Sequence, residues 1–310
     1  MLSSLQSEKK RRELNEKLIK SALILAAAIS ILTTFGILFS ILFEAIEFFQ
    51  LRSFWYFLTG TIWSPGVANS QFGALPIFAG TFVITIIALL VAIPIGLGSA
   101  IYMSEYASPK FRDYLKPILE ILAGIPTVVY GFFAAITVAP LVVKAAAFFG
   151  LEATFNSALA SGIVMGIMII PLISSLSDDV IRAVPDSQRK AAFALGMTHG
   201  ETIKNIVIPS AMPGIISASL LALSSALGET MIVVMAAGLR PNLSWNPLED
   251  MTTVTVTIVN SLVGDFEFNS PETLSAFALG LVLFIVTLIL NMISLSLIRK
   301  FKEKYKVNTL

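Results

Sequence analysis

The sequence of 310 residues contains no cysteine and a single histidine, His199. The absence of cysteine excludes disulfide bonds, thiolate metal ligands and cysteine nucleophiles, and one histidine excludes a metal site built from several imidazoles. Charge is also scarce, because Asp, Glu, Lys and Arg make up 13% of the residues where soluble domains carry about 25%. With 56% hydrophobic residues and a mean hydropathy of +0.84, the chain is predicted to be an all-α polytopic membrane protein.

Motifs for nucleotide binding and covalent catalysis are missing as well. Neither G-x-x-x-x-G-K-[ST] nor a G-x-G-x-x-G that opens a helix after a strand occurs, and G-x-S-x-G is absent. Paired carboxylates of the kind that membrane enzymes use are not evident either. We therefore expect a chain that is not an enzyme, holds no metal and no cofactor, and has no means of using ATP by itself.

Six apolar segments are long enough to cross a bilayer as helices, which takes about 20 residues each. They lie near residues 21–43, 75–103, 118–143, 157–177, 211–238 and 274–298. A seventh apolar segment, 251–264, is shorter and rich in threonine, so we expect it to lie on the bundle as a helix or to enter the membrane as a re-entrant piece. The aromatic stretch FWYFLTGTIW at 54–63 is typical of an interfacial belt.

Lysine and arginine are distributed unevenly between the two sides of these spans. Six precede the first span, three lie in 104–117, four in 178–210 and five after the last span, against only Arg52, Lys144 and Arg240 on the other side. The positive-inside rule then predicts that both termini are cytoplasmic. We divide the chain into a basic N-terminal segment (1–20), a first span with its outer loop (21–74), a main transmembrane domain (75–298) that includes the cytoplasmic loop 178–210, and a basic tail (299–310).

Glu229 is the only charged residue between Lys204 and Arg240. Counted from Pro213 at 1.5 Å per residue, it lies about 24 Å along the fifth predicted span, past the middle of the membrane. Intramembrane acids face the bundle or water and mark functional paths; the alternative is a protonated side chain that bonds a neighbouring helix and only fixes packing. The positions three, four and seven residues away along a helix are mostly Ala or Ser, which predicts a closely packed face or a narrow cavity: Ala222, Ser225, Ala226, Ile232, Val233 and Ala236.

The stretch GIPTVVYG interrupts the third predicted span at Gly124 and Pro126. The hydroxyls of Thr127 and Tyr130 either line a path or serve as partners for the freed backbone groups. Glu120, one turn after Pro117, is expected at the start of this span, where a carboxylate interacts favourably with the helix dipole.

The cytoplasmic loop contains RKAAFALGMTHGETIKNIVIPSAMPG, residues 189–214. It is predicted to form a short helix, a glycine turn and a second helix that Pro209 ends. Small residues on an exposed helix indicate a docking surface, although an ordinary loop between spans is the alternative. The spacing of the Ala pair, of Gly196 and of Ile206-x-Ile-Pro209 resembles the EAA loop of ABC importer permeases, whose coupling helices fit a cleft in the ATPase subunit. Lys190 stands where that motif usually has Glu. The resemblance implies a coupling surface formed by Lys190, Ala191, Ala192, Leu195, Gly196, Gly200 and Glu201.

Further segments resemble the C-type permease subunit of Pst phosphate importers, from about residue 72 to about residue 298. They are VAIPIGLGSAIYMSEYA (91–107), EILAGIPTVVYGFFA (120–134), LGETMIVVMAAG (227–238) and, as an outer loop, NPLEDMTTVTVTIV (246–259). The resemblance implies a type I ABC importer permease bundle in the bacterial inner membrane. It also implies a second homologous permease, an ATPase dimer that uses ATP and Mg, and a phosphate-binding protein outside the membrane as partners.

A substrate path follows from the same resemblance, with one departure from the family. The residues implied are Glu229, Thr230, Ser225, Thr127 and Tyr130. The family usually carries Arg four residues before the glutamate, whereas this chain has Ser225 and so no basic residue inside a predicted span. A permease for sulfate, molybdate or tungstate therefore stays open as an alternative, and a secondary transporter or channel is the alternative from another class.

Overall fold

The computed structural model describes residues 2–66, 69–263, 267 and 269–304, so the end of the predicted tail 299–310 lies outside the described residues. The regular secondary structure of the described chain is helical apart from a short antiparallel hairpin in which Trp63 pairs with Phe72. The elements in chain order are α1 (Leu2–Leu51), α2 (Phe54–Thr59), β1 (Trp63–Ser64), β2 (Gln71–Phe72), α3 (Leu75–Ile101), the π-helical turn η1 (Tyr102–Tyr106), α4 (Pro109–Ala123), α5 (Thr127–Phe133), η2 (Ala134–Val138), α6 (Ala139–Phe148), α7 (Ala158–Arg182), α8 (Asp186–Ala194), α9 (His199–Thr202), η3 (Ile203–Val207), α10 (Ile208–Gly228), α11 (Met231–Ala236), α12 (Val254–Val263) and α13 (Pro271–Lys304).

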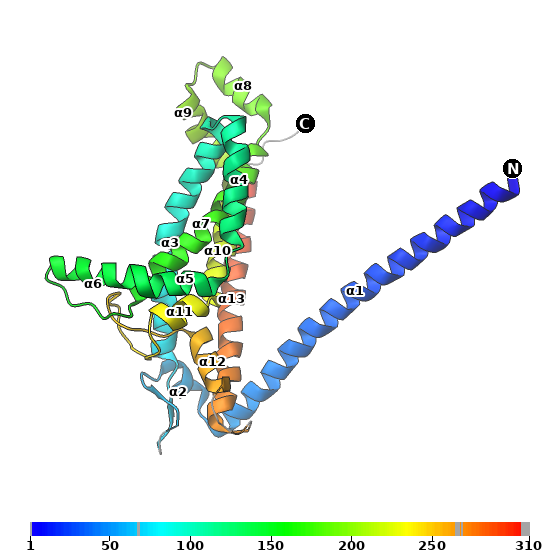
Figure 1. Ribbon diagram of the computed structural model, residues 1–310. Coiled ribbons are helices and arrows are strands. Elements are labelled where there is room, and N and C mark those ends of the chain that lie inside the picture. The colour runs from blue at the N-terminus through cyan, green and yellow to red at the C-terminus, as the bar shows by residue number, and fades with distance from the viewer. Residues whose placement is uncertain (1, 67–68, 264–266, 268, 305–310) are drawn as a thin grey trace.

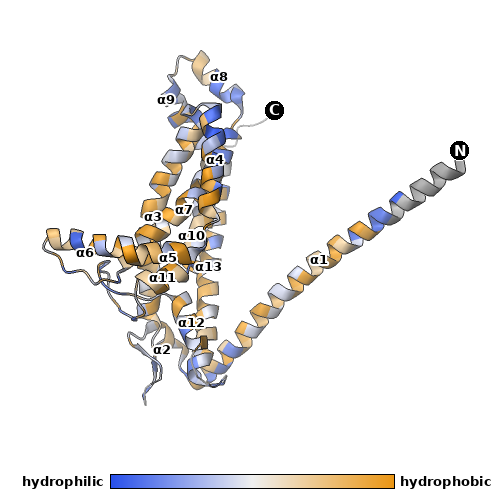
Figure 2. Cartoon of the chain, in the orientation of Figure 1, coloured by the Kyte–Doolittle hydropathy of each residue, from blue (hydrophilic) through white to orange (hydrophobic). Residues whose placement is uncertain are grey.

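Six helical stretches of the described chain are long and apolar enough to cross a membrane, which confirms the predicted number. They are Asn15–Leu51, Leu75–Tyr106, Thr127–Phe148, Ala158–Arg182, His199–Gly228 and Pro271–Lys300. Figure 1 shows α8, α9 and the start of α4 at one end of the bundle, and α2 and α12 at the other. In Figure 2 hydrophilic residues gather on α8 and α9, while the helices between the two ends are mostly apolar. This arrangement agrees with the prediction that successive loops lie at opposite ends of the bundle. Which end faces the cytoplasm stays a prediction.

The centre of the bundle is the pair α3 and α7, which pack closely because their glycines carry no side chain. A Cβ at Gly162 would lie 2.7 Å from the Cβ of Ile87, and a Cβ at Gly166 would lie 2.7 Å from that of Val91. Small residues spaced by four let apolar helices approach this closely in membranes, where van der Waals packing holds helices together. This pair, called the central frame below, is the part of the bundle against which α4, α5, α10 and α12 pack.

The first helix, α1, has 50 residues and is about 75 Å long at 1.5 Å per residue. Figure 1 shows it leaving the bundle at an angle, joined to it only near its C-terminal end. There Phe48 packs edge to face on Phe57 and Phe72, with ring centroids 5.4 and 5.5 Å apart. Phe57 and Trp63 are buried in this cluster, so the predicted interfacial belt is wrong for these two residues, while Trp55 is exposed.

Two predicted boundaries are wrong for reasons of backbone geometry. The third span was predicted at 118–143 with an interruption at Gly124 and Pro126; α4 ends at Ala123, before this interruption, and the apolar stretch that is long enough to span runs from Thr127 to Phe148. Figure 1 shows α5 and α6 crossing α3 and α7 instead of running along them. Glu120 consequently lies in the last turn of α4 and not at a helix start, so the predicted interaction with a positive helix end is absent for it.

Pro209 does not end the second helix of the loop 178–210, which was predicted to be cytoplasmic. The helix continues from α9 through η3 into α10, with Pro209 in the first turn of α10. The N–H of Ile208 bonds to the carbonyl of Ile203, five residues back, so the turn before the proline is widened by one residue. Such a turn accommodates a ring that a regular α-helix interior would not accept.

Candidate functional site

Glu229 lies at a break between two helices and not in the middle of one. α10 ends at Gly228, the backbone of Glu229 is extended at φ −70° and ψ 135°, and α11 begins at Met231. The predicted continuous face of small residues around Glu229 is therefore wrong, because helical spacing does not extend across the break. Within α10, Ala222 and Ala226 are buried, and Ser225 is exposed.

The carboxylate of Glu229 caps the following half-helix. Its Oε1 accepts hydrogen bonds from the backbone N–H groups of Met231 at 2.9 Å and Ile232 at 3.3 Å. These are first-turn donors that a helix cannot satisfy itself, and an acidic side chain at this end is favoured. The other oxygen, Oε2, has no hydrogen bond within the part of the chain that the structure describes. One oxygen thus holds the backbone while the second is left for another group.

The segment predicted as a surface or re-entrant helix supports this break from the side. α12 packs against α3, α11 and α13, and the hydroxyl of Thr255 donates to the carbonyl of Glu229 at 2.8 Å. At the start of α12, the N–H of Val254 bonds to the hydroxyl of Thr81 on α3 at 3.0 Å. α12 therefore fixes the extended residue between the two half-helices to the central frame.

The second break, at Gly124 and Pro126, was predicted from the sequence and is confirmed. The hydroxyl of Tyr130 donates to the carbonyl of Leu122 at 2.9 Å, which supplies a partner for a backbone group at the end of α4. Because the Tyr130 ring is buried among apolar side chains, the structure favours its role in repairing the break over one in lining a path. Thr127 is half-buried at the start of α5, and its hydroxyl makes no hydrogen bond among the described residues.

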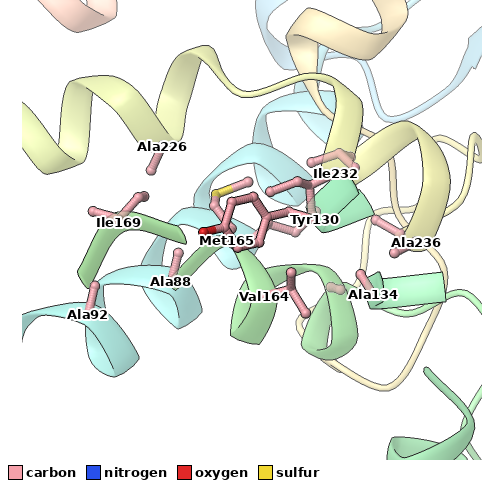
Figure 3. Packing of buried hydrophobic residues seen from close by; sticks show 14 of the residues in the cluster. Ala88, Ala92, Tyr130, Ala134, Val164, Met165, Ile169, Ala226, Ile232 and Ala236 are labelled. Atoms are coloured by element: carbon pink, nitrogen blue, oxygen red, sulfur yellow. The ribbon is translucent and has the colours of Figure 1, made fainter. Parts of the chain in front are cut away.

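The two breaks are brought together in space. Figure 3 shows Tyr130 of α5 beside Ile232 of α11, and Ala226 of α10 belongs to the same buried cluster. A Cβ at Gly131 would lie 3.1 Å from the carbonyl oxygen of Met231, so the two half-helices touch almost backbone to backbone. Discontinuous helices that meet inside a membrane are typical of substrate sites in transporters. Of the predicted path residues, Glu229, Thr230 and Thr127 lie at these helix starts, Ser225 lies one turn before the break, and Tyr130 is in the core.

The predicted coupling surface is largely exposed. α8 ends at a turn where Gly196 adopts φ +83°, a left-handed conformation that favours glycine. α9 then begins with a capping box in which the side chains of Thr198 and Glu201 each bond the other's backbone N–H. Leu195 is 81% exposed, but Ala192 is only 3% exposed and packs inside the chain, so it is not available to a partner. The exposed members of the predicted surface are Lys190, Ala191, Leu195, Gly196, Gly200 and Glu201.

Ion pairs at this same end of the bundle were not anticipated from the sequence. Arg112 of α4 pairs with the buried Asp178 of α7 at 2.7 Å, and Arg189 of α8 pairs with Glu105 of η1 at 2.8 Å. The sequence contains a signal for such pairs, because segments 104–117 and 178–210 are predicted on the same side of the membrane and each contains both acidic and basic residues. Only the fold shows which charges meet.

At the other end, the loop 239–253 is held by Glu249. Its carboxylate accepts from the side-chain amides of Asn242 at 2.8 Å and Asn246 at 3.0 Å. Hydrogen bonds from Asn242, Asn246 and Ser244 lower the pKa of Glu249 below its ordinary value of 4.5. The carbonyls of Pro247 and Glu249 in turn accept from Leu159 and Ala158 in the first turn of α7, so the loop caps that helix.

Comparisons with known proteins place this architecture in a family. Residues 92–306 match the family described as "Binding-protein-dependent transport system inner membrane component". The chain belongs to this family. It is 35% identical to the "Probable ABC transporter permease protein YqgH" of Bacillus subtilis over 81% of this chain and 78% of that protein.

Other relatives cover most of the chain. It is 34% identical to the "Phosphate transport system permease protein PstC" of Mesorhizobium japonicum over 86% of this chain and 84% of that protein. It is 32% identical to PstC 1 of Mycobacterium tuberculosis over 79% and 82%. The fold is similar to that of a bacterial alginate ABC transporter, with a TM-score of 0.59, 16% identity and coverage of 90% of this chain and 94% of that one. This family member is thus a multi-pass protein of the bacterial inner membrane and a transport subunit.

Proposed function

We propose that this chain is one transmembrane half of an ATP-driven importer of inorganic phosphate. The observation that carries the proposal is similarity to relatives named PstC along more than three quarters of the chain, at 32 and 34% identity. The type I permease fold and the exposed α8–α9 segment agree with it. The proposed partners are a second homologous permease, an ATPase dimer docked on α8 and α9, and a phosphate-binding protein at the α2 and α12 end. ATP and Mg are used by the ATPase partner, and α8 and α9 transmit its movement.

The meeting of the two helix breaks is the proposed path. Its polar groups are the free Oε2 of Glu229 and the hydroxyls of Thr230, Ser225 and Thr127. Hydrogen phosphate still carries a P–O–H group, which donates a hydrogen bond to Oε2 of Glu229 in this proposal, whereas sulfate has no such donor. Because Oε1 of Glu229 is held by backbone N–H groups, Oε2 points in a defined direction. This fixed orientation favours selection of an anion that carries a hydrogen-bond donor over equal repulsion of all anions.

A reconstituted complex tests the substrate. The chain is co-purified with its second permease and ATPase, placed in proteoliposomes with the binding protein, and assayed for uptake of labelled phosphate with sulfate or molybdate as competitors. We expect uptake that excess unlabelled phosphate suppresses and excess sulfate does not. Uptake suppressed equally by sulfate would identify a general oxyanion permease, the alternative that Ser225 keeps open.

Substitutions of Glu229 separate its two roles. Glu229→Gln keeps an oxygen that accepts from Met231 and Ile232 but removes the charge, and Glu229→Ala also removes the cap, at a cost of about 1 kcal/mol of stability. We expect the Gln variant to assemble normally and to lose discrimination between phosphate and sulfate. Unchanged uptake and unchanged discrimination in this variant would refute a role for the charge.

A further inference from the structure

Arg189, near the middle of α8, contacts two other elements, η1 and α7, and the link between α7 and α8. Its Nη2 donates to Oε1 of Glu105 in η1 at 2.8 Å and to the carbonyl of Ile181 in α7 at 3.0 Å. Its Nη1 donates to the carbonyl of Val184 and contacts Asp186 at the start of α8 at 3.4 Å. The planar guanidinium suits such a junction because its donors form a rigid fork.

Glu105, the ion-pair partner of Arg189, is contacted by both α8 and α9. The side chain of Glu105 is only 6% exposed and pairs with Arg189 of α8. The backbone carbonyl of Glu105 lies 3.2 Å from Nε2 of His199 in α9, and the adjacent Tyr106 ring lies edge to face with the His199 ring at 5.0 Å. η1 is the direct continuation of α3, so α8 and α9 both contact the end of the central helix.

We propose that the Arg189–Glu105 pair is a coupling clamp, in which Arg189 is a positioning residue that carries displacement of α8 and α9 to α3. This inference rests on the proposed function of the chain. A displaced α8 moves Glu105 with it, because separating the two leaves a largely buried carboxylate without its cation. α3 then moves together with α7, since the glycine contacts leave no space between them. A π-helical turn at the junction is consistent with a functional position.

The chain offers a matched control pair. Lys116 of α4 and Asp179 of α7 also form an ion pair at 2.8 Å, but their side chains are 33% and 54% exposed, and among the described residues their side chains hydrogen-bond only each other. Exposed pairs contribute little. Loss of this pair is expected to leave coupling unchanged.

The test measures phosphate transport and ATP hydrolysis in the same proteoliposomes, for the complete complex with its binding protein. Wild type is compared with Arg189→Met, Glu105→Gln, the double variant, Arg189→Lys and the control Lys116→Met. We expect both single variants to lower the phosphate moved per ATP by at least about fivefold, the lower end of coupling between sites. The double variant is expected to be no worse than either single variant, because both remove one interaction. Arg189→Lys is expected to restore part of the ratio, and the control to match wild type.

A merely structural role would lower the amount of complex, and so both rates together, without changing their ratio. An unchanged ratio in both single variants, or losses that add in the double variant, would overturn the clamp. If Arg189→Met fails to assemble, Glu105→Gln decides, because it keeps the size and an acceptor oxygen of the glutamate. A wild-type complex that transports sulfate in place of phosphate would contradict the proposed substrate only, and the clamp is then read from sulfate moved per ATP.

Discussion

Replacing Gly166 by alanine is expected to destabilise the chain, although alanine is the better helix former. The new Cβ would lie 2.7 Å from the Cβ of Val91 and 2.8 Å from the carbonyl oxygen of Ala88, where ordinary contacts begin at 3.4 Å. The carbonyl belongs to the backbone of α3, so relief requires the two central helices to separate. Overpacking of this kind costs about 1–3 kcal/mol, against a gain in helix propensity of at most about 1 kcal/mol. Subtracting a gain of about 1 kcal/mol leaves a net loss of up to about 2 kcal/mol, and the short contact with backbone places the expected value toward the upper end.

Gly98→Ala on α3 is the control, because a Cβ at Gly98 would meet nothing within 4 Å. This variant gains the propensity without the clash and is expected to be more stable than wild type by about 0.5–1 kcal/mol. Both variants are purified in detergent, and the free energy of unfolding is measured by titration with a denaturing detergent, followed by circular dichroism. The opposite sign of the two changes is the decisive result. A Gly166→Ala variant as stable as Gly98→Ala would refute the close contact between α3 and α7.

Two further predictions concern the break at Gly124 and Pro126 and the loop 239–253. Tyr130→Phe removes the hydrogen bond to the carbonyl of Leu122 and is expected to cost about 1 kcal/mol in the same unfolding assay, whereas Thr127→Val is expected to change stability little because its hydroxyl has no hydrogen bond among the described residues. Because hydrogen bonds lower the pKa of Glu249, its contribution to stability is present at neutral pH and is lost as the pH falls through that lowered pKa, below about 4.5. Glu249→Gln is therefore expected to flatten the fall in thermal stability on acidification, and an unchanged acid profile would contradict this origin of the shift.

Much of the architecture could be predicted from local properties of the sequence. Length and hydropathy predict six spans, because each apolar stretch must hydrogen-bond its own backbone inside lipid. Gly124 and Pro126 predict a break in any helix that contains them. The sequence also contains a local signal for the close contact of α7 with α3, because Gly162 and Gly166 form a G-x-x-x-G in an apolar segment.

The break at Glu229 had no comparable local signal. Gly228, Glu229 and Thr230 stand in a long apolar run without proline, so helical continuation is the natural prediction. The extended conformation is held by Thr255, 26 residues further along the chain, and by the capping carboxylate itself. Likewise, charge counts place Arg189 and Glu105 on the same side of the membrane, and only packing brings them to 2.8 Å.

The sequence by itself determined the class of protein, the number of spans, the family resemblance and one of the two helix breaks. These depend on composition and on neighbours within a few residues, where the physics is local. The tertiary structure alone decided that Glu229 caps a half-helix, that Ala192 and Tyr130 are buried, and which charges pair beside α8. Those outcomes depend on contacts between segments far apart in the chain, and the free energy of such contacts is not a property of any one segment.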